Sequence, residues 1–231
     1  MARVSPFRVD LHVHTRQGSL DSTIEPAQMV EHARVRGLAG VAITEHFRLW
    51  STDEAARWST LEFRVYPAAE VVTEIGHVLA VGLDRFPRTR CIDELAEQAR
   101  IDGAALVLAH PFRAYFDTSH HWLLRDGPVA DPVAAAARQS TGLVSAIEVL
   151  NNGCTAGENR LASELAAAIN VVPVASSDAH TIDHVGRYAT SFARLPSDSR
   201  DLAAALMAGE AGVGIDHKEP RPAERTALDE R

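Results

Sequence analysis

The stretch RVDLHVHT, residues 8–15, indicates both a first buried strand and the chemistry at its end. It places His12 and His14 two residues apart behind an apolar run. In an extended strand such side chains point to the same face, so both imidazoles can reach one metal ion. Taken alone, the pair also allows a plainer interpretation, namely two unrelated polar side chains at a strand end.

Imidazole and carboxylate side chains follow several further apolar runs in the same way. The carboxyl ends of parallel strands meet at one edge of a sheet or barrel, where ligands bind, so we expect these side chains to form one site. Nitrogen and oxygen donors of this kind suit Zn, Mn or Fe, and the sequence therefore predicts a metal site with more than one ion. The residues are Glu45, His46, Glu70, His110, Asp178 and His180.

Continuous apolar runs alternate with helical patterns over most of the chain. This alternation predicts parallel βα units, hence an open α/β sheet or a (β/α) barrel. Helices are expected over 26–36, over 93–102 with Asp93 as N-cap, from Asp131-Pro132, over 158–170, and after Ser197 or Asp198. The predicted strands are 8–13, 39–44, 63–69, 78–83, 104–109, 144–150 and 171–176, with further short runs at 188–193 and 212–215.

Two long connections interrupt this rhythm, 47–62 and 112–130. They contain all three tryptophans of the chain, Trp50, Trp58 and Trp122. Connections of this length are often functional, but the aromatic side chains could equally cap the ends of the core.

Composition excludes several classes of protein. The chain has 231 residues, of which 46% are hydrophobic and 23% charged, as in an ordinary globular domain. We find no apolar stretch of membrane-spanning or signal-peptide length and expect a cytoplasmic protein without membrane contact. A net charge of −8 argues against binding long nucleic acid. We expect one barrel domain over 1–216 and a charged, flexible tail over 217–231.

The motifs as a set resemble the PHP (polymerase and histidinol phosphatase) superfamily over about residues 8–193. The resemblance implies a distorted (β/α)7 TIM-like barrel in a single α/β domain that binds two to three divalent ions. The motifs are DLHVHT at 10–15, ITEH at 43–46, Glu70, GHVLAVG at 76–82, AHP at 109–111 and SSDAH at 176–180.

By the same resemblance, three ligand sets are expected, and Glu70, Asp178 and His180 have catalytic roles. His77 precedes its strand, so only the resemblance assigns it to the site. The expected sets are His12, His14, Glu70 and Asp178 for the first ion, Glu70, His77 and His110 for the second, and Asp21, His46 and His180 for the third.

Such a site favours an anionic substrate. Three divalent ions facing three carboxylates leave the pocket cationic, and a hydroxide shared by two ions is a nucleophile at neutral pH. We therefore expect hydrolysis of a small phosphate ester, for example of a nucleotide, sugar or amino alcohol. Arg113, Arg187 and Arg48 are candidate phosphate-binding side chains, although each could instead form an ordinary surface ion pair.

Three other functions stay open at this point. An amidohydrolase or lactonase on a similar barrel is one, although such enzymes commonly use a carboxylated lysine and the single lysine here is Lys218 in the tail. A 3′–5′ exonuclease on short oligonucleotides is another, and a non-catalytic scaffold that has lost metal is the third.

Several further residues have expected local roles. We expect Glu148 and Asn151 to shape the floor of the site and Cys154 to pack rather than react. The remaining histidines are expected to be exposed or locally hydrogen-bonded, with His121 and His184 as possible edges of the pocket. They are His32, His120, His121, His184 and His217.

Overall fold

The computed structural model describes residues 7–116, 121–125 and 127–214. They form one α/β domain around a nine-stranded sheet in the order β7-β6-β5-β4-β3-β2-β1-β8-β9. All nine predicted strands are confirmed within a few residues. Their bounds are β1 Phe7–Val13, β2 Gly40–Glu45, β3 Arg64–Thr73, β4 Gly76–Val81, β5 Ala105–Leu108, β6 Ala146–Asn151, β7 Val172–Ser176, β8 Ala189–Phe192 and β9 Ala211–Gly214.

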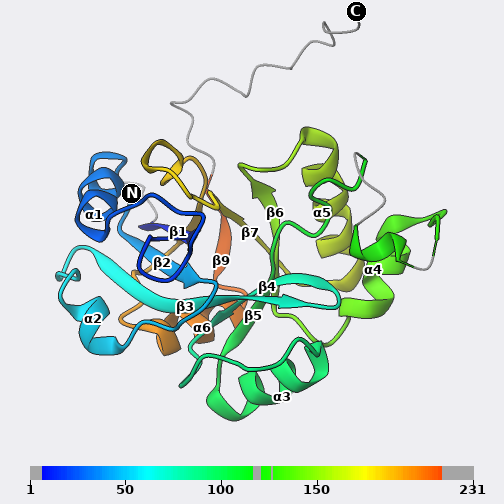
Figure 1. Cartoon of the computed structure of the whole chain (residues 1–231), viewed down its shortest axis with the longest axis horizontal. Coiled ribbons are helices and arrows are strands. Elements are labelled where there is room, and N and C mark those ends of the chain that lie inside the picture. The colour runs from blue at the N-terminus through cyan, green and yellow to red at the C-terminus, as the bar shows by residue number, and fades with distance from the viewer. Residues whose placement is uncertain (1–6, 117–120, 126, 215–231) are drawn as a thin grey trace, which may run out of the picture.

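The sheet curls into a nearly closed barrel, as predicted (Figure 1). Its two edge strands, β7 and β9, pack against each other. A bridge from Val13 to Ala179 joins the end of β1 to the segment after β7. The carboxyl ends of β1 and β7 therefore lie next to each other although they are 163 positions apart in the chain, at Val13 and Ser176.

Strand directions differ from the prediction of parallel units throughout. β1, β2 and β3 are mutually parallel, as are β5, β6 and β7. β4 is antiparallel to both of its neighbours, because β3 and β4 form a hairpin that turns at residues 74–75. β8 and β9 are also antiparallel to their partners. These reversed strands are what distorts the barrel.

Helices surround the sheet and confirm most of the predicted spans. Asp131 and Asp198 are N-caps as expected, and their side chains accept hydrogen bonds from Ala134 N and Arg200 N. Asp93 is not an N-cap, because the helix begins earlier and Glu74 binds the backbone N–H of Ile92. The bounds are α1 Pro26–Val35, α2 Thr52–Ala56, α3 Ile92–Asp102, α4 Pro132–Ser140, α5 Ala156–Ile169 and α6 Ser199–Met207, with 3-10 turns at Trp122–Leu124 and Ile182–His184.

Short helix α2 lies inside the 47–62 connection and was not predicted. The sequence does contain its signal, because Ser51 and Glu54 form a capping box in which each side chain binds the other's backbone N–H. Trp50 is 2% exposed, so this tryptophan caps the core, which is the plainer of the two expectations.

The barrel interior is filled by small and branched side chains, which pack tightly because the radius is small. Tyr66 is the largest of them, and its hydroxyl donates to Pro196 O at 2.8 Å. This packed interior leaves the carboxyl edge of the parallel strands as the place for a site. The other side chains of this interior cluster include Val9, Leu11, Ala42, Ala68, Leu79, Val81, Ala105, Val107, Ala146 and Val174.

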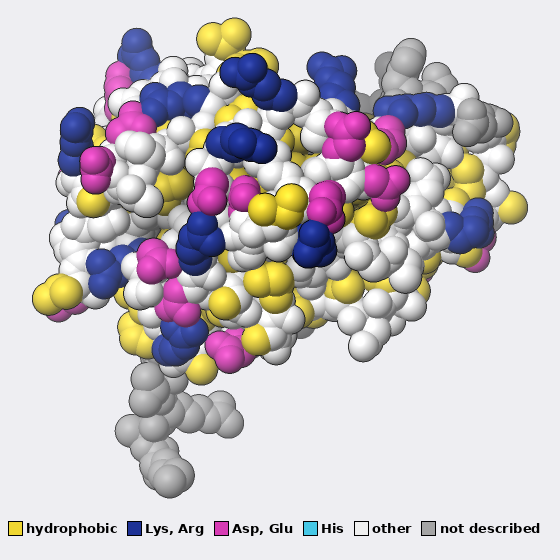
Figure 2. Space-filling view, turned by 90° about the horizontal axis from the view of Figure 1, so that it is seen from below, with side chains coloured by type: hydrophobic (Ala, Val, Ile, Leu, Met, Phe, Trp, Pro, Cys, Tyr) yellow, Lys and Arg dark blue, Asp and Glu magenta, His cyan; other side chains and the backbone are white. Residues whose placement is uncertain are grey.

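The face seen from below Figure 1 has arginines interspersed with carboxylates and shows no histidine of the described residues (Figure 2). The histidine cluster therefore does not open onto this face. None of the described helices has the length and hydropathy that a membrane crossing requires. The predicted tail over 217–231, His120 and His217 lie outside the described residues.

Candidate metal centre

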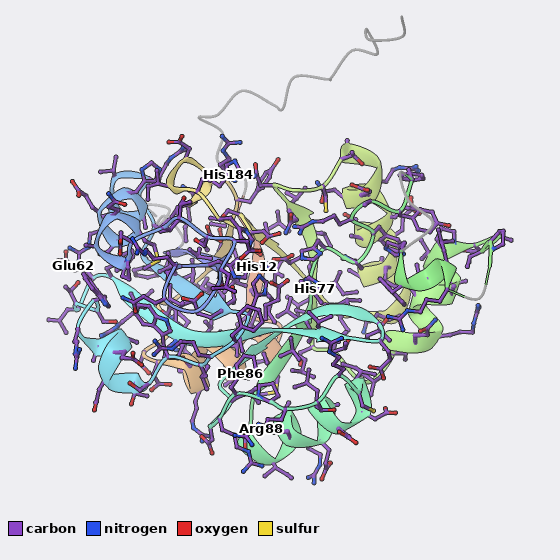
Figure 3. The ribbon with its side chains drawn as sticks, in the orientation of Figure 1. His12, Glu62, His77, Phe86, Arg88 and His184 are labelled. Carbon is purple, nitrogen blue, oxygen red and sulfur yellow. The ribbon has the colours of Figure 1, made fainter. Side chains whose placement is uncertain are left out.

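Nine side chains predicted as metal ligands converge at the carboxyl edge of the parallel strands. β1 supplies His12, and His14 follows directly after it, so the two rings lie on one face with centroids 4.9 Å apart. Both imidazoles are completely buried. Figure 3 shows His12 and His77 near each other in the middle of the molecule, with His184 nearer its edge.

The first cluster consists of His12, His14, Glu70 and Asp178. Nε2 of each histidine is 3.4 Å from Asp178 Oδ1, while Glu70 Oε1 lies 3.4 Å from His12 Nε2 and Glu70 Oε2 lies 3.3 Å from His14 Nε2. Donors about 2.1 Å from a tetrahedral ion are about 3.4 Å apart, which is the spacing found here.

Three atoms of this cluster are buried without a hydrogen-bond partner among the described residues: His12 Nε2, His14 Nε2 and Asp178 Oδ1. Buried polar atoms are nearly always partnered, so orphaned lone pairs that converge on one point indicate a missing cation. The first cluster therefore fits a divalent ion.

The second cluster joins Glu70 to His77 and His110. Glu70 Oε1 lies 2.7 Å from His77 Nδ1 and 3.2 Å from His110 Nε2. Burial opposes the charge on Glu70, but the surrounding imidazoles, His12 foremost, hold its pKa well below the ordinary value. Burial, reinforced by Arg113, lowers the pKa of His110 to about 4, which keeps this imidazole neutral and able to bind a cation.

The third cluster is the most open of the three. Asp21 Oδ2 lies 3.5 Å from His46 Nε2 and 3.3 Å from His180 Nε2. His14, His46 and His180 also offer ligand atoms within 4.8 Å of one another. Asp21 has a 59% exposed side chain, and its pKa is lowered because the imidazole of His180 outweighs its partial burial. Burial lowers the pKa of His180 to about 4.

Glu148, on β6, contacts two of these ligands, His12 and His110, through atoms that do not face the clusters. Its carboxylate lies 2.9 Å from His12 Nδ1 and accepts a hydrogen bond of 2.9 Å from the backbone N–H of His110. Asn151 Nδ2 and the Ser176 hydroxyl bind the same carboxylate. Burial opposes its charge, but His12 holds the pKa of Glu148 at about 2, and Glu148 with Glu70 raises that of His12 to about 10. Glu148 thus orients His12 with Nε2 toward the cluster.

Glu45 performs the same task for His14 through a hydroxyl. Buried Glu45 accepts hydrogen bonds from Ser19 Oγ, Thr15 N and Trp50 Nε1. Ser19 Oγ in turn lies 3.1 Å from His14 Nδ1. Glu45 therefore acts on His14 through Ser19.

Asp10 ties β1 to the segment that contains Asp178. Its buried carboxylate accepts hydrogen bonds from the backbone N–H groups of Ser177, at 3.0 Å, and Gly186, at 2.9 Å. Asp178 and His110 adopt φ angles of +51° and +28°, which are strained for residues other than glycine. Such strain persists where the surroundings enforce it, and two of the four described non-glycine residues with positive φ are these candidate ligands.

The three predicted phosphate-binding arginines have different neighbours. Arg113 binds Asp178 in a close ion pair and donates to Asn151 Oδ1 at 3.0 Å. Arg187 is exposed and donates to Asn152 Oδ1 at 3.2 Å. Asn151, the last residue of β6, thus binds the guanidinium of Arg113 beside Asp178, and the next residue, Asn152, binds that of Arg187.

Arg48 is oriented differently from the other two arginines. It forms an ion pair with Glu54 and lies over the Trp50 ring at 6.0 Å from its centroid. In this structure Arg48 therefore forms an ordinary ion pair within residues 47–56, which is the alternative to phosphate binding that the sequence left open.

The remaining predictions of local roles concern two histidines and a thiol. His121 is buried and bonds to Pro111 O at 2.9 Å, and His32 accepts from Arg36 at 3.3 Å, so both are locally engaged. Burial raises the pKa of the Cys154 thiol to about 12, which agrees with a packing role.

Comparison with known proteins identifies the family. A family model described as PHP domain matches residues 10–125, and one described as PHP-associated matches residues 156–211. An uncharacterized protein of Methanocaldococcus jannaschii is 26% identical over 118 residues, covering 46% of this chain and 68% of that protein.

Solved structures share the fold at low sequence identity. PsfC from Pseudomonas syringae is 21% identical with a TM-score of 0.61, and 93% of each chain is covered. A two-domain Bacteroides vulgatus protein containing a predicted PHP-like metal-dependent phosphoesterase is 18% identical with a TM-score of 0.65, covering 91% of this chain and 65% of that one. An amidohydrolase from Chromobacterium violaceum with bound sulfate is 16% identical, with a TM-score of 0.53, covering 75% of this chain and 87% of that one.

Proposed function

Because this chain belongs to the PHP domain family and is a metal-dependent hydrolase of that type, we propose that it hydrolyses a phosphate ester of a small molecule. The observation that carries the proposal is the orphaned set of His12 Nε2, His14 Nε2 and Asp178 Oδ1, which converges at tetrahedral spacing. Divalent ions held there would activate water and stabilise the attacking and leaving oxygens of an in-line displacement.

We propose that the nine ligand side chains hold two to three ions, with Zn, Mn or Fe as candidates. The side chains supply both the negative charge that the ions need and the contacts that orient the ligands. Glu70 belongs to the first two clusters and lies 3.2 Å from His46 Nδ1 of the third, Asp178 belongs to the first, and Glu148 keeps His12 in the tautomer that presents Nε2. His180, with Asp21 and His46, would hold the outer ion, which gives it its part in catalysis.

Arg113 and Arg187 are proposed to bind the non-bridging phosphate oxygens. Guanidinium groups match such oxygens with paired N–H donors. Asn151 and Asn152 hold them at the edge of the site, and the sulfate named for the Chromobacterium structure is a tetrahedral oxyanion of the same shape. Arg48 is paired with Glu54, which is not a candidate ligand, whereas Arg113 is paired with the candidate ligand Asp178, so we rank Arg48 behind Arg113.

The test is metal analysis combined with turnover of p-nitrophenyl phosphate and its bis ester. The wild-type protein should hold two or three ions per chain and release p-nitrophenol, and the His12→Ala and His14→Ala variants should lose both properties. His32→Ala is the matched control, since His32 bonds locally to Arg36, and it should behave as wild type. Full turnover by His12→Ala would refute the assignment.

An amide or lactone bond is the second candidate, because one structural neighbour is titled an amidohydrolase. Metal-loaded protein that cleaves neither phosphate ester but opens a lactone or an N-acyl substrate would favour it. A 3′–5′ exonuclease would instead release mononucleotides from short oligonucleotides, and its binding would weaken steeply as salt is raised.

A further inference from the structure

The mouth of the candidate metal centre carries two apolar side chains that the metal chemistry does not need. Phe47 is 68% exposed and Leu20 is 91% exposed. Each is the immediate neighbour in sequence of a ligand of the outer cluster, since Phe47 follows His46 and Leu20 precedes Asp21. The Phe47 ring meets the His46 ring edge-on, with centroids 6.0 Å apart.

The exposure of Phe47 is fixed by its backbone. Phe47 N donates to Gly18 O at 3.2 Å, and His46 N donates to the Ser19 hydroxyl at 3.2 Å. Trp50, three residues on, is buried and donates to Glu45. With its backbone fixed on both sides, Phe47 projects from the protein rather than folding into the core.

The loop that contains Gly18 and Leu20 packs closely against the loop that contains Phe47. A Cβ at Gly18 would lie 2.6 Å from Arg48 Cγ and 2.7 Å from Glu45 Cβ, so no larger side chain fits there without movement. Arg48 is itself paired with Glu54. Phe47 is therefore presented by a loop that is packed against the Gly18 loop, which makes its position preorganised.

We propose that Phe47 forms the subsite that binds the leaving group of the substrate, and that this group carries a flat aromatic or heterocyclic ring. The inference rests on the proposed phosphoesterase function. A ring bound against Phe47 would remove its exposed face from water and stack at offset or edge geometry. The anionic end of the same molecule would then lie toward the ion that His46 and the outer cluster would hold.

The experiment compares two primary alkyl phosphates whose ester chemistry is alike, 2-phenylethyl phosphate and n-butyl phosphate, with Mn²⁺ in the buffer. Wild-type protein should prefer the phenyl compound in kcat/KM. Phe47→Ala should lose about tenfold on the phenyl compound, the size expected for one lost ring stack, and little on the butyl one. Phe47→Tyr should retain the preference.

Two measurements separate this role from a merely structural one. Metal content is measured in wild type and Phe47→Ala and should be the same in both. The control is needed because loss of a His46-bound ion would slow the hydrolysis of both substrates equally. Leu61→Ala is the matched control: Leu61 is exposed in the same connection but lies by Arg34 and Phe63, away from the cluster. Equal losses on both esters would overturn the inference and leave the phosphoesterase proposal intact.

If neither ester is cleaved, the proposed function is overturned, and a binding measurement then tests the aromatic subsite by itself. Calorimetry compares the affinities of the matching phosphonates, 2-phenylethylphosphonate and n-butylphosphonate. A tighter phenyl compound whose advantage disappears in Phe47→Ala would then still support the aromatic subsite, and equal affinities would overturn it.

Discussion

Replacing Glu148 by Gln should uncouple His12 from the metal centre while preserving shape. The carboxylate accepts from His110 N and Asn151 Nδ2 on one oxygen and faces His12 Nδ1 and the Ser176 hydroxyl with the other. The backbone N–H of His110 cannot become an acceptor, so the amide oxygen of Gln should stay on that side. Its NH₂ group then faces His12 Nδ1.

That orientation reverses the tautomer of His12. Nδ1 must then accept from the amide, so the proton moves to Nε2, the atom that is 3.4 Å from both Glu70 and Asp178. A protonated Nε2 cannot bind a cation. Loss of a partner behind a metal-ligating histidine typically lowers metal affinity about 10- to 100-fold. Without metal, breaking this buried pair should lower the free energy of unfolding by about 3 kcal/mol.

Competition with a chromophoric chelator measures the affinity, and guanidinium denaturation of metal-free protein measures the stability. Glu164→Gln is the control, because Glu164 forms an exposed helical pair with Arg160 at 3.4 Å and should change the free energy of unfolding by less than about 0.5 kcal/mol. Wild-type metal affinity in Glu148→Gln would refute the reasoning, since it would mean that Glu148 does not set the His12 tautomer.

Three further outcomes are expected. Metal binding should release protons at pH 8, because the pKa of His12 in metal-free protein is raised to about 10, and calorimetric heats that are identical in buffers of different ionisation enthalpy would contradict this. The same raised pKa makes the stabilisation from the His12–Glu148 pair complete below about pH 6.5 and lost as pH rises through about 10, so the difference in unfolding free energy between metal-free wild type and Glu148→Gln should shrink over that window. Cys154→Ala should keep metal and turnover, and iodoacetamide should alkylate Cys154 slowly at pH 8 because burial raises the thiol pKa to about 12.

The strand positions could be predicted because continuous apolar runs are visible in one sequence. Strand directions could not, since direction depends on which strands pair, and that is a property of the whole sheet. The Ser51–Glu54 capping box shows a different kind of failure. Its signal was present, but it lay in a connection interpreted as irregular. Asp93 was wrong as an N-cap because Glu74, far away in sequence, binds the helix start instead.

The candidate site shows the same division between local and tertiary information. His12 and His14 are brought together by strand period alone, which the sequence displays. The roles of Glu45 and Asp10 depend on Ser19 and on Ser177 and Gly186, and such contacts become visible only when the strands are assembled.

His77 joins the site because β4 is reversed. In a barrel of parallel strands, the start of a strand lies at the edge opposite the ligands, and a residue at the start of β4 would sit about 17 Å from them across six residues. The β3–β4 hairpin instead places Gly76 opposite Thr73, so the start of β4 meets the end of β3. His77 then lies 2.7 Å from Glu70, which the same hairpin contains. A histidine that opens a strand after a two-residue turn is therefore as strong a candidate ligand as one that closes a strand.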